Sequence, residues 1–221
     1  MAIIVHTPTF LTLLGGAPTH FSHVKQALTL APILVAADGG ATLAVANGII
    51  PDAVIGDLDS LTQAARAAIP AARIHHIAEQ DSTDFDKCLD RIEARAILAL
   101  GFSGGRLDHQ LAACSSLVKF TDKTVFLISE EDVCFVCPSQ LDLDLPEGTR
   151  FSIYPMSEMR GTSAGLAYPI DGLTLSPTGI VGTSNAVTGP VSLKVAQGEA
   201  LVIVPRDCLE AVLAQMVGAQ K

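Results

Sequence analysis

Residues 33–60, ILVAADGGATLAVANGIIPDAVIGDLDS, contain the pattern that decides the fold of the first half of the chain. Two short apolar runs, 33–37 and 53–55, flank an alanine-rich stretch typical of a helix, and each run ends in an acidic or glycine-rich turn. Strands that are apolar at every position are typical of a parallel sheet covered by helices on both faces. The stretch therefore predicts a strand–helix–strand unit of an α/β fold.

The same alternation extends outward from this stretch to about residue 120. An opening strand leads into the turn at Gly15 and Gly16, and another apolar run covers 96–100. A set of apolar residues before that run has the spacing of one helix face: Phe85, Cys88, Leu89, Ile92 and Ala96. We therefore expect a mostly parallel sheet in this half.

The second half of the chain has a different periodicity. Short apolar runs, several of them alternating with period two, are separated by Gly, Pro, Ser and Asp, which is typical of antiparallel strands. These runs cover 124–128, 133–136, 150–154, 173–176, 191–195 and 201–204. We expect an α/β domain over residues 1–122 and an all-β, sandwich-like domain over 123–221, with a boundary placed to within about ten residues.

The composition excludes several classes of protein. In 221 residues, 49% are hydrophobic and 17% are charged, which argues against a disordered chain. The net charge of −9 argues against a nucleic-acid partner, which would require a basic face. No apolar run approaches the roughly 20 residues of a membrane-spanning helix, and no basic residue precedes Lys25, so we expect neither a membrane partner nor a signal peptide.

The cysteines indicate a reducing compartment. Their number is five, which is odd, in a chain large enough to fold without disulfides. Cys134 and Cys137 lie in an apolar, strand-like run with no second pair to complete a zinc site, so we expect buried thiols and a cytoplasmic protein.

Acidic and glycine-rich motifs follow the predicted strands, where open α/β sheets bind their ligands. The first motif contains Asp38, Gly39 and Gly40. Paired glycines allow the backbone to approach a ligand closely, and the following helix offers N–H groups to an anion. An ordinary turn is the alternative for this motif taken alone.

The second motif contains Asp57 and Asp59. If the chain stays extended past Ile55, both side chains point to the same side, where two carboxylates repel each other unless a cation lies between them. Mg²⁺ prefers such oxygen ligands. A solvated acidic loop is the alternative.

The third motif covers residues 80–87, QDSTDFDK. Thr83 and Asp86 have a spacing like that of a capping box, which predicts Thr83 as the N-cap of a helix. Capping alone would explain these two residues and would leave Asp84 and Lys87 on the surface.

The fourth motif covers residues 100–110, LGFSGGRLDHQ. A glycine-rich turn that presents Arg106 suits phosphate recognition, because a guanidinium group matches phosphate oxygens. Asp108 or His109 could instead cap the following helix or pair with Arg106, and His109 is a less favoured candidate for a catalytic base.

The order of these motifs resembles that of the thiamin pyrophosphokinase family. The resemblance rests on ADGGA, PDAVIGDLDS, QDSTDFDKC and GFSGGRLDHQ, and continues more loosely in 163–169, SAGLAYP, and 182–186, GTSNA. It implies transfer of a pyrophosphoryl group from ATP to thiamin, giving thiamin diphosphate and AMP. It also implies an α/β domain that binds ATP and Mg²⁺, a β-sandwich that helps to bind thiamin, and a homodimer with active sites between subunits.

The resemblance implies roles for individual residues. Asp38, Asp57, Asp59 and Asp84 match the metal and polyphosphate centre, and three of them, Asp57, Asp59 and Asp84, form the catalytic set together with Arg106. The residues that match substrate-binding positions are Asp38, Gly39, Gly40, Gln80, Asp81, Thr83, Lys87, Gly104, Gly105, Asp108, Ser184 and Asn185. Ser184 and Asn185 match a segment that approaches thiamin from the partner subunit.

Two other functions use the same residues. A Mg²⁺-dependent nucleotide phosphohydrolase would need the same carboxylates, with water as the attacking group, and a non-catalytic module that senses thiamin or nucleotide would need only binding. The sequence has no Gly-x₄-Gly-Lys-Ser/Thr loop, so ATP must be held by metal, turns and Arg106. It also has no Trp, so a ring stacked on thiamin would come from Tyr or Phe.

Overall fold

The computed structural model describes residues 2–218. The chain divides into two compact units, Met1–Glu130 and Glu131–Lys221, which we call unit 1 and unit 2. The division falls after residue 130, within ten residues of the predicted boundary. The run at 124–128, which its pattern assigned to the all-β half, contains a strand that pairs parallel with a strand of unit 1. That part of the prediction is wrong.

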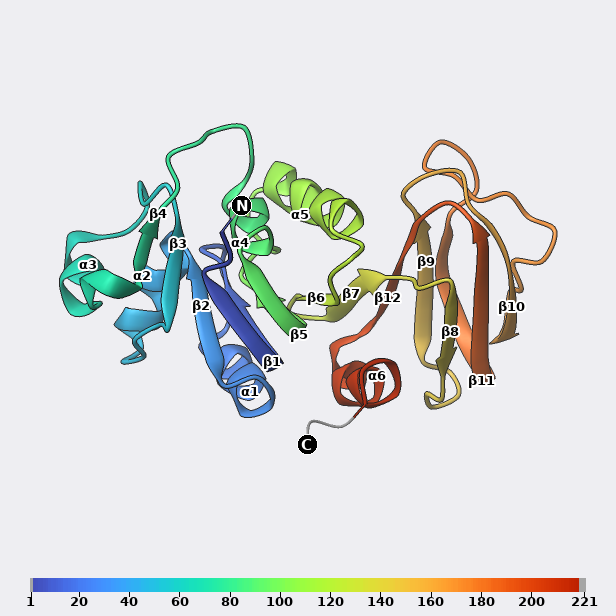
Figure 1. Cartoon of the computed structure of the whole chain (residues 1–221). Helices are drawn as coiled ribbons and strands as arrows, with labels where there is room; N and C mark the ends of the chain where they lie inside the picture. Colours follow the sequence, from blue (N-terminus) through green and yellow to red (C-terminus); the bar gives the residue numbers. More distant parts are fainter. Residues whose placement is uncertain (1, 219–221) are drawn as a thin grey trace. The chain divides into compact units, whose positions relative to one another are not determined.

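Unit 1 is built on a parallel sheet (Figure 1). Its strands lie in the order β6-β5-β1-β2-β3-β4. The strands are β1 (Val5–Leu14), β2 (Ile33–Ala37), β3 (Ala53–Gly56), β4 (Ile74–His76), β5 (Ile92–Leu100) and β6 (Val125–Ile128). The helices are α1 (Phe21–Leu30), α2 (Gly39–Ala46), α3 (Gln63–Ala68), α4 (Asp84–Leu89) and α5 (Leu107–Lys119), with a 3₁₀ turn, η1 (Ala71–Arg73).

The central strands of this sheet are buried along most of their length. Every residue of β3 is buried, and Leu11, Val35 and Ile97 of the neighbouring strands are at most 1% exposed. Burial on both faces explains why these strands are apolar at consecutive positions rather than alternating. The predicted α/β fold of this half is confirmed.

The helix that begins at Asp84 is shorter than its apolar spacing predicted. It ends at Leu89, and Ile92 and Ala96 belong to β5, which pairs with β1 over most of its length. The prediction that these two residues continue the helix face is wrong. Both are buried because β5 is a central strand, and the apolar positions of this strand match a helical spacing by coincidence.

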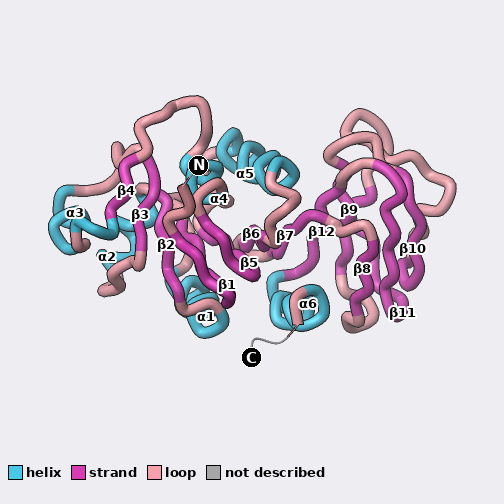
Figure 2. The backbone as a smooth tube through the Cα atoms, viewed as in Figure 1, coloured by secondary structure: helices cyan, strands magenta, loops and turns pink. Residues whose placement is uncertain are grey.

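Unit 2 is antiparallel throughout its strand pairs. Its strands are β7 (Asp132–Val136), β8 (Gln140–Leu143), β9 (Arg150–Pro155), β10 (Arg160–Leu166), β11 (Gly182–Gln197) and β12 (Ala200–Pro205), followed by η2 (Arg206–Cys208) and α6 (Leu209–Met216). Figure 2 shows this unit as strands and loops apart from its C-terminal helical part.

The long strand β11 joins the two sheets of unit 2. Its first part pairs with β9, which is followed in that sheet by β12 and β7, and its second part pairs with β8 and β10 in the other sheet. This arrangement confirms the sandwich-like prediction. The strand predicted at 173–176 is wrong, because only isolated bridges at Leu175 form there, and β8 and β10 were missed. The sequence of β10, RGTSAGL, has no apolar run that would have revealed it.

No helix within residues 2–218 is both long and apolar enough to span a bilayer.

Glycines allow the loops at the carboxyl ends of the strands of unit 1 to pack closely. A Cβ atom on Gly15 would lie 2.4 Å from the carbonyl oxygen of Gly101, whose own φ is +74°. In the first turn of α2, a Cβ atom on Gly40 would lie 2.0 Å from the carbonyl oxygen of Leu14. The ends of β1, β2 and β5 therefore meet without side chains between them.

We predict that Gly40→Ala destabilises the protein, although alanine normally favours a helix. The added methyl group overlaps the Leu14 carbonyl, so the free energy of unfolding should fall by about 1–3 kcal/mol in denaturant titrations. Gly39→Ala is the matched control, because its Cβ atom would make only ordinary contacts, with the Ser60 Cβ atom at 3.4 Å and the Gly16 Cα atom at 3.6 Å. Equal stability of the two variants would contradict this packing.

Candidate active site

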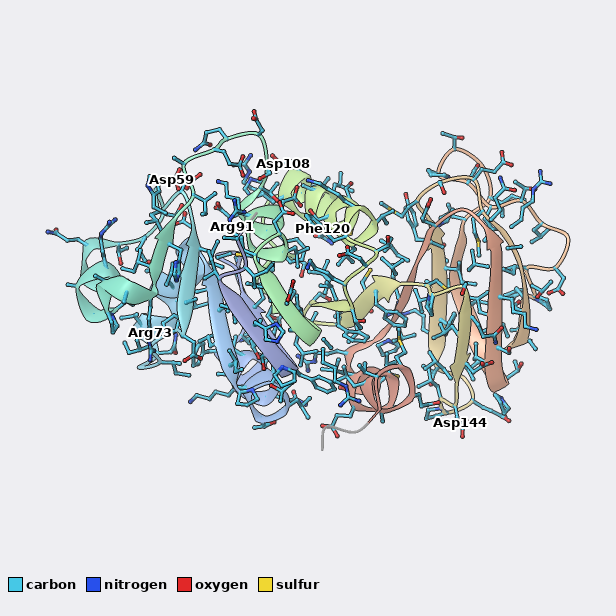
Figure 3. All side chains as sticks on the ribbon, viewed as in Figure 1. Asp59, Arg73, Arg91, Asp108, Phe120 and Asp144 are labelled. Carbon is cyan, nitrogen blue, oxygen red and sulfur yellow. The ribbon has the colours of Figure 1, made fainter. Side chains whose placement is uncertain are left out.

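A cleft of about 600 Å³ lies in unit 1 at the carboxyl ends of its strands. Its lining comes from the segments that follow β1, β2, β3 and β5, and from α4 and α5. The predicted site residues that line it are Asp38, Gly39, Asp57, Thr83, Asp84, Lys87, Gly105 and Arg106. In Figure 3, Asp59 and Asp108 lie near the upper edge of unit 1, and Arg73 lies below them on the left.

Three carboxylates form the acidic part of this site. One oxygen each of Asp38, Asp57 and Asp59 lies within 4.8 Å of the others. The sequence predicted that Asp57 and Asp59 lie close together because the chain stays extended past Ile55. The two residues do lie close together, but the predicted reason is wrong. β3 ends at Gly56, and Leu58 has a φ of +66°, so a left-handed residue turns the chain and brings the two carboxylates together.

Asp38 is buried and only partly satisfied by hydrogen bonds. Its Oδ2 accepts a bond of 3.0 Å from the backbone N–H of Ser60, whereas its buried Oδ1 has no partner among the described residues. Burial and the nearby Asp84 raise the pKa of Asp38 to about 6, although the Ser60 bond acts in the opposite direction. A buried carboxylate oxygen without a donor is an expected ligand for a hard cation.

Lys87 is a buried cation beside the carboxylates, with a side chain that is 1% exposed. Its Nζ donates to Asp57 Oδ2 at 3.1 Å and to Asp84 Oδ1 at 3.0 Å. Burial alone would lower the pKa of Lys87, but the bonds to Asp84 and Asp57 outweigh it and the pKa lies above its ordinary value. The alternative that Lys87 is a surface residue is wrong.

Asp57 and Asp84 therefore differ from each other in their surroundings. Burial tends to raise the pKa of Asp57, but bonds from Lys87, the Asp59 backbone and Gln80 hold it below its ordinary value. Asp84 lies outside the group of three carboxylates and pairs with Lys87. The role of Asp84 as a metal ligand stays a prediction.

The loop before α4 is held by a glutamate that the sequence analysis did not single out. Glu79 accepts bonds from the backbone N–H groups of Asp81 and Ser82 and from the Ser82 hydroxyl. In this loop, Gln80 Nε2 donates to Asp57 Oδ2 at 3.2 Å, and the Asp81 side chain is exposed.

Thr83 is the N-cap of α4, as predicted, and accepts a bond of 3.1 Å from the Asp86 N–H. The Asp86 side chain contacts α5 instead of completing the capping box. Its oxygens accept bonds from Ser116 Oγ and from Lys119 Nζ. The alternative that Asp86 acts only as a cap is wrong, because this buried carboxylate ties α4 to α5.

Arg106 is exposed at the start of α5. Its guanidinium group forms two bonds with Asp108, at 3.1 and 2.5 Å, and these bonds lower the pKa of Asp108 to about 2. The pairing that the sequence left open is therefore present, and His109 lines the cleft nearby. Gly104 and Gly105 form the turn that presents Arg106.

Ser184 and Asn185 lie in β11 of unit 2. Ser184 has a φ of 60°, and its N–H donates to Ser152 Oγ. The Asn185 amide is buried and bonded to both backbone groups of Tyr168, at 2.9 and 2.6 Å. The Asn185 side chain therefore holds the backbone at Tyr168 against β11. The Tyr168 side chain itself is 71% exposed.

Sequence reasoning missed two parts of the cleft. In Gly15–Pro18, only Gly15 and Gly16 were interpreted, as a turn, and Phe102 was quoted only as part of a glycine-rich motif. The signal for the first was available, because these residues follow a buried parallel strand just as Asp38 and Asp57 do. The contact of Phe102 with Phe85 depends on tertiary packing and has no sequence signal.

The chain is similar to known thiamin pyrophosphokinases. A family model described as "Thiamin pyrophosphokinase, catalytic domain" matches residues 24–128. "Thiamin pyrophosphokinase 1" of Caenorhabditis elegans is 30% identical over 196 residues, which cover 79% of this chain and 80% of that protein. The thiamine pyrophosphokinase of Bacillus subtilis (strain 168) is 31% identical over 159 residues, 65% of this chain and 74% of that protein.

A solved structure shares the fold. The crystal structure of thiamin pyrophosphokinase from Geobacillus thermodenitrificans matches with a TM-score of 0.74 and 23% identity, over 90% of this chain and 98% of that chain.

We predict a pH-dependent effect of Asp38→Asn in the chelator-treated protein. The pKa of Asp38 is raised from 3.8 to about 6 in the folded chain. As the pH rises from 3.8 to 6, Asp38 therefore ionises in the unfolded chain but stays protonated in the folded chain, and the wild type loses stability. Asparagine does not ionise, so it avoids this loss of stability, and its side-chain oxygen can still accept the bond from the Ser60 N–H. At pH 7.5 the free energy of unfolding should rise by about 1–3 kcal/mol, and near pH 4 the gain should vanish.

Denaturant titrations at the two pH values measure this difference. Asp122→Asn is the control, because Asp122 is an exposed aspartate away from the cleft. A gain for Asp38→Asn that is equal at both pH values would show that the charge of Asp38 is not its cause.

Proposed function

Because the chain belongs to the thiamin pyrophosphokinase family, we propose that the cleft of unit 1 is the place where it carries out the reaction of that family. The reaction transfers a pyrophosphoryl group from ATP to the hydroxyethyl oxygen of thiamin, giving thiamin diphosphate and AMP. The observation that carries the assignment is the group of three carboxylates, Asp38, Asp57 and Asp59, beside the buried Lys87.

We propose that these three carboxylates hold Mg²⁺. Their oxygens are close enough to share one cation, and the unpartnered Oδ1 of Asp38 supports this placement. When bound, the metal ion neutralises charge on the polyphosphate and polarises it. It would also allow a chain with a net charge of −9 to accept an anionic nucleotide.

Lys87 and Arg106 supply positive charge from the protein itself. Two of the three N–H groups of Lys87 donate to Asp57 and Asp84, which aims the ammonium group and leaves one donor for a phosphate oxygen. Arg106 is exposed at the cleft and can exchange its contact with Asp108 for phosphate oxygens. Phosphoryl-type transfer depends mainly on such positioning and charge stabilisation.

The remaining predicted positions keep proposed roles in substrate binding. Gly39, Gly40, Gly104 and Gly105 provide backbone close to the nucleotide, and the 80–84 loop lies at the edge of the carboxylates. Thiamin carries a cationic thiazolium ring, which suits an acidic site.

We propose that unit 2 contributes to thiamin binding in a homodimer with active sites between subunits. The support is the GTSNA segment at 182–186, in which the strained Ser184 and the bonded Asn185 define a fixed backbone shape.

We also propose a cytoplasmic location, supported by the buried thiols of Cys88 and Cys137.

Product analysis tests the reaction. With thiamin and Mg-ATP, ³¹P NMR and chromatography should detect thiamin diphosphate and AMP in equal amounts, with AMP release that depends on thiamin. Stoichiometric ADP would indicate transfer of a single phosphoryl group. Nucleotide breakdown that proceeds equally without thiamin would indicate a phosphohydrolase, and tight binding without turnover would indicate a sensing module.

Asp59→Asn tests the metal site. The variant keeps the shape of the side chain and relieves repulsion among three carboxylates, so its melting temperature should equal or slightly exceed that of the wild type. Turnover should fall by about 100-fold or more, because the metal ion supplies several kcal/mol of charge stabilisation. The affinity for Mg-ATP should fall more than the affinity for thiamin.

Asp122→Asn again serves as the control and should leave turnover unchanged. Near-normal turnover of Asp59→Asn at limiting Mg²⁺ would mean that these residues are only an acidic loop.

A further inference from the structure

Part of the cleft lining carries no charged side chain. We call this part the uncharged wall, and it consists of Gly15, Gly16, Ala17, Pro18, Phe102 and Ala113. The charged residues in the remainder of the lining are Asp38, Asp57, Asp84, Lys87 and Arg106. The cleft therefore offers two chemically different surfaces to one ligand.

Phe102 is the largest side chain of the uncharged wall, and its ring is firmly supported. Its centroid lies 4.3 Å from that of Phe85, with an angle of 33° between the rings. The loop after β1 packs directly on it, because a Cβ atom on Gly15 would lie 2.8 Å from a carbon of the Phe102 ring. Phe102 is nevertheless only half-buried and lines the cleft.

The uncharged wall lies where the sheet topology favours a ligand. β1 and β5 are neighbours in the sheet, with β2 on the other side of β1 and β6 on the other side of β5. The strand order therefore reverses between β1 and β5, and open α/β sheets bind ligands outside the carboxyl ends of strands at such a point. The segments after these two strands contain Gly15–Pro18 and Phe102.

We propose that the adenine ring of ATP packs against Phe102 on the uncharged wall. This inference rests on the proposed function. The triphosphate is anionic and belongs with the metal site, Lys87 and Arg106, whereas adenine is flat, neutral and weakly polar, which matches an aromatic surface without charges. The thiazolium of thiamin is a cation and gains more from the carboxylates. Phe102 is thus a binding residue for the nucleoside part of the donor.

The test compares two ligands that share a polyphosphate and differ in the base. Titration calorimetry without thiamin measures the binding of Mg-ATP and of Mg-tripolyphosphate to the wild type and to Phe102→Ala. Stacking of a base on an aromatic ring typically corresponds to a factor of about 5–150 in affinity. We expect Phe102→Ala to bind Mg-ATP at least about fivefold more weakly and to bind Mg-tripolyphosphate within about twofold of the wild type.

Two further variants sharpen the comparison. Phe102→Leu keeps an apolar side chain on Phe85 and loses the flat ring, so its affinity for Mg-ATP should lie between those of the other two proteins. It decides the question alone if Phe102→Ala does not fold. Leu111→Ala is the control, because Leu111 is an apolar residue of α5 that is 60% exposed and lies outside the cleft lining. It should change neither affinity.

Three results would overturn the proposal. Unchanged affinity for Mg-ATP would place the base elsewhere, and equal weakening of both ligands would show that Phe102 only maintains the shape of the cleft. A raised KM for thiamin with unchanged binding of Mg-ATP would assign the ring to the acceptor. Failure of the proposed function is distinguishable, because it would appear as a wild type that forms no thiamin diphosphate.

Discussion

The buried ammonium group of Lys87 is the constraint on which the rest of the site depends. A charge with a side chain that is 1% exposed costs several kcal/mol to bury unless it is paired, and its Nζ lies 3.1 Å from Asp57 and 3.0 Å from Asp84. Asp57 follows β3, and Asp84 opens α4. The pairing therefore fixes α4 against the end of β3, and the residues that form it are ones to which we assign roles in the proposed reaction.

This pairing also divides the acidic residues into two groups with different tasks. Asp84 balances Lys87, whereas Asp38, Asp57 and Asp59 bring oxygens within 4.8 Å of one another. Asp57 belongs to both groups, since Oδ2 contacts Lys87 and the same carboxylate belongs to the cluster of three. A cation held by the three carboxylates and the ammonium group of Lys87 would then face the same polyphosphate, so that two positive charges of different origin act at one place.

The sequence was most informative where burial on both faces dictates residue type, as in β2, β3 and the second half of β5. It was misleading where the spacing of apolar residues fits both a helix and a strand, as for Ile92 and Ala96, which belong to β5. The positions of Asp38 and Asp57 in one cleft follow from parallel strands that end at one edge. The burial of Lys87 depends on how α4 packs and did not follow from the pattern. The turn at Leu58, with its φ of +66°, could not be foreseen, because a leucine seldom adopts it and only the surrounding structure maintains it.

The proposed metal site is tested most directly by locating the ion. Mn²⁺ has ligand preferences close to those of Mg²⁺ and scatters X-rays anomalously, so it can be located in crystals of the protein grown with it. We expect an anomalous peak within about 2.3 Å of one oxygen each of Asp38, Asp57 and Asp59, with Lys87 Nζ still bonded to Asp84. A crystal grown with Mn²⁺ that shows no peak at these three carboxylates, or that shows Lys87 occupying the space between them, would contradict the account.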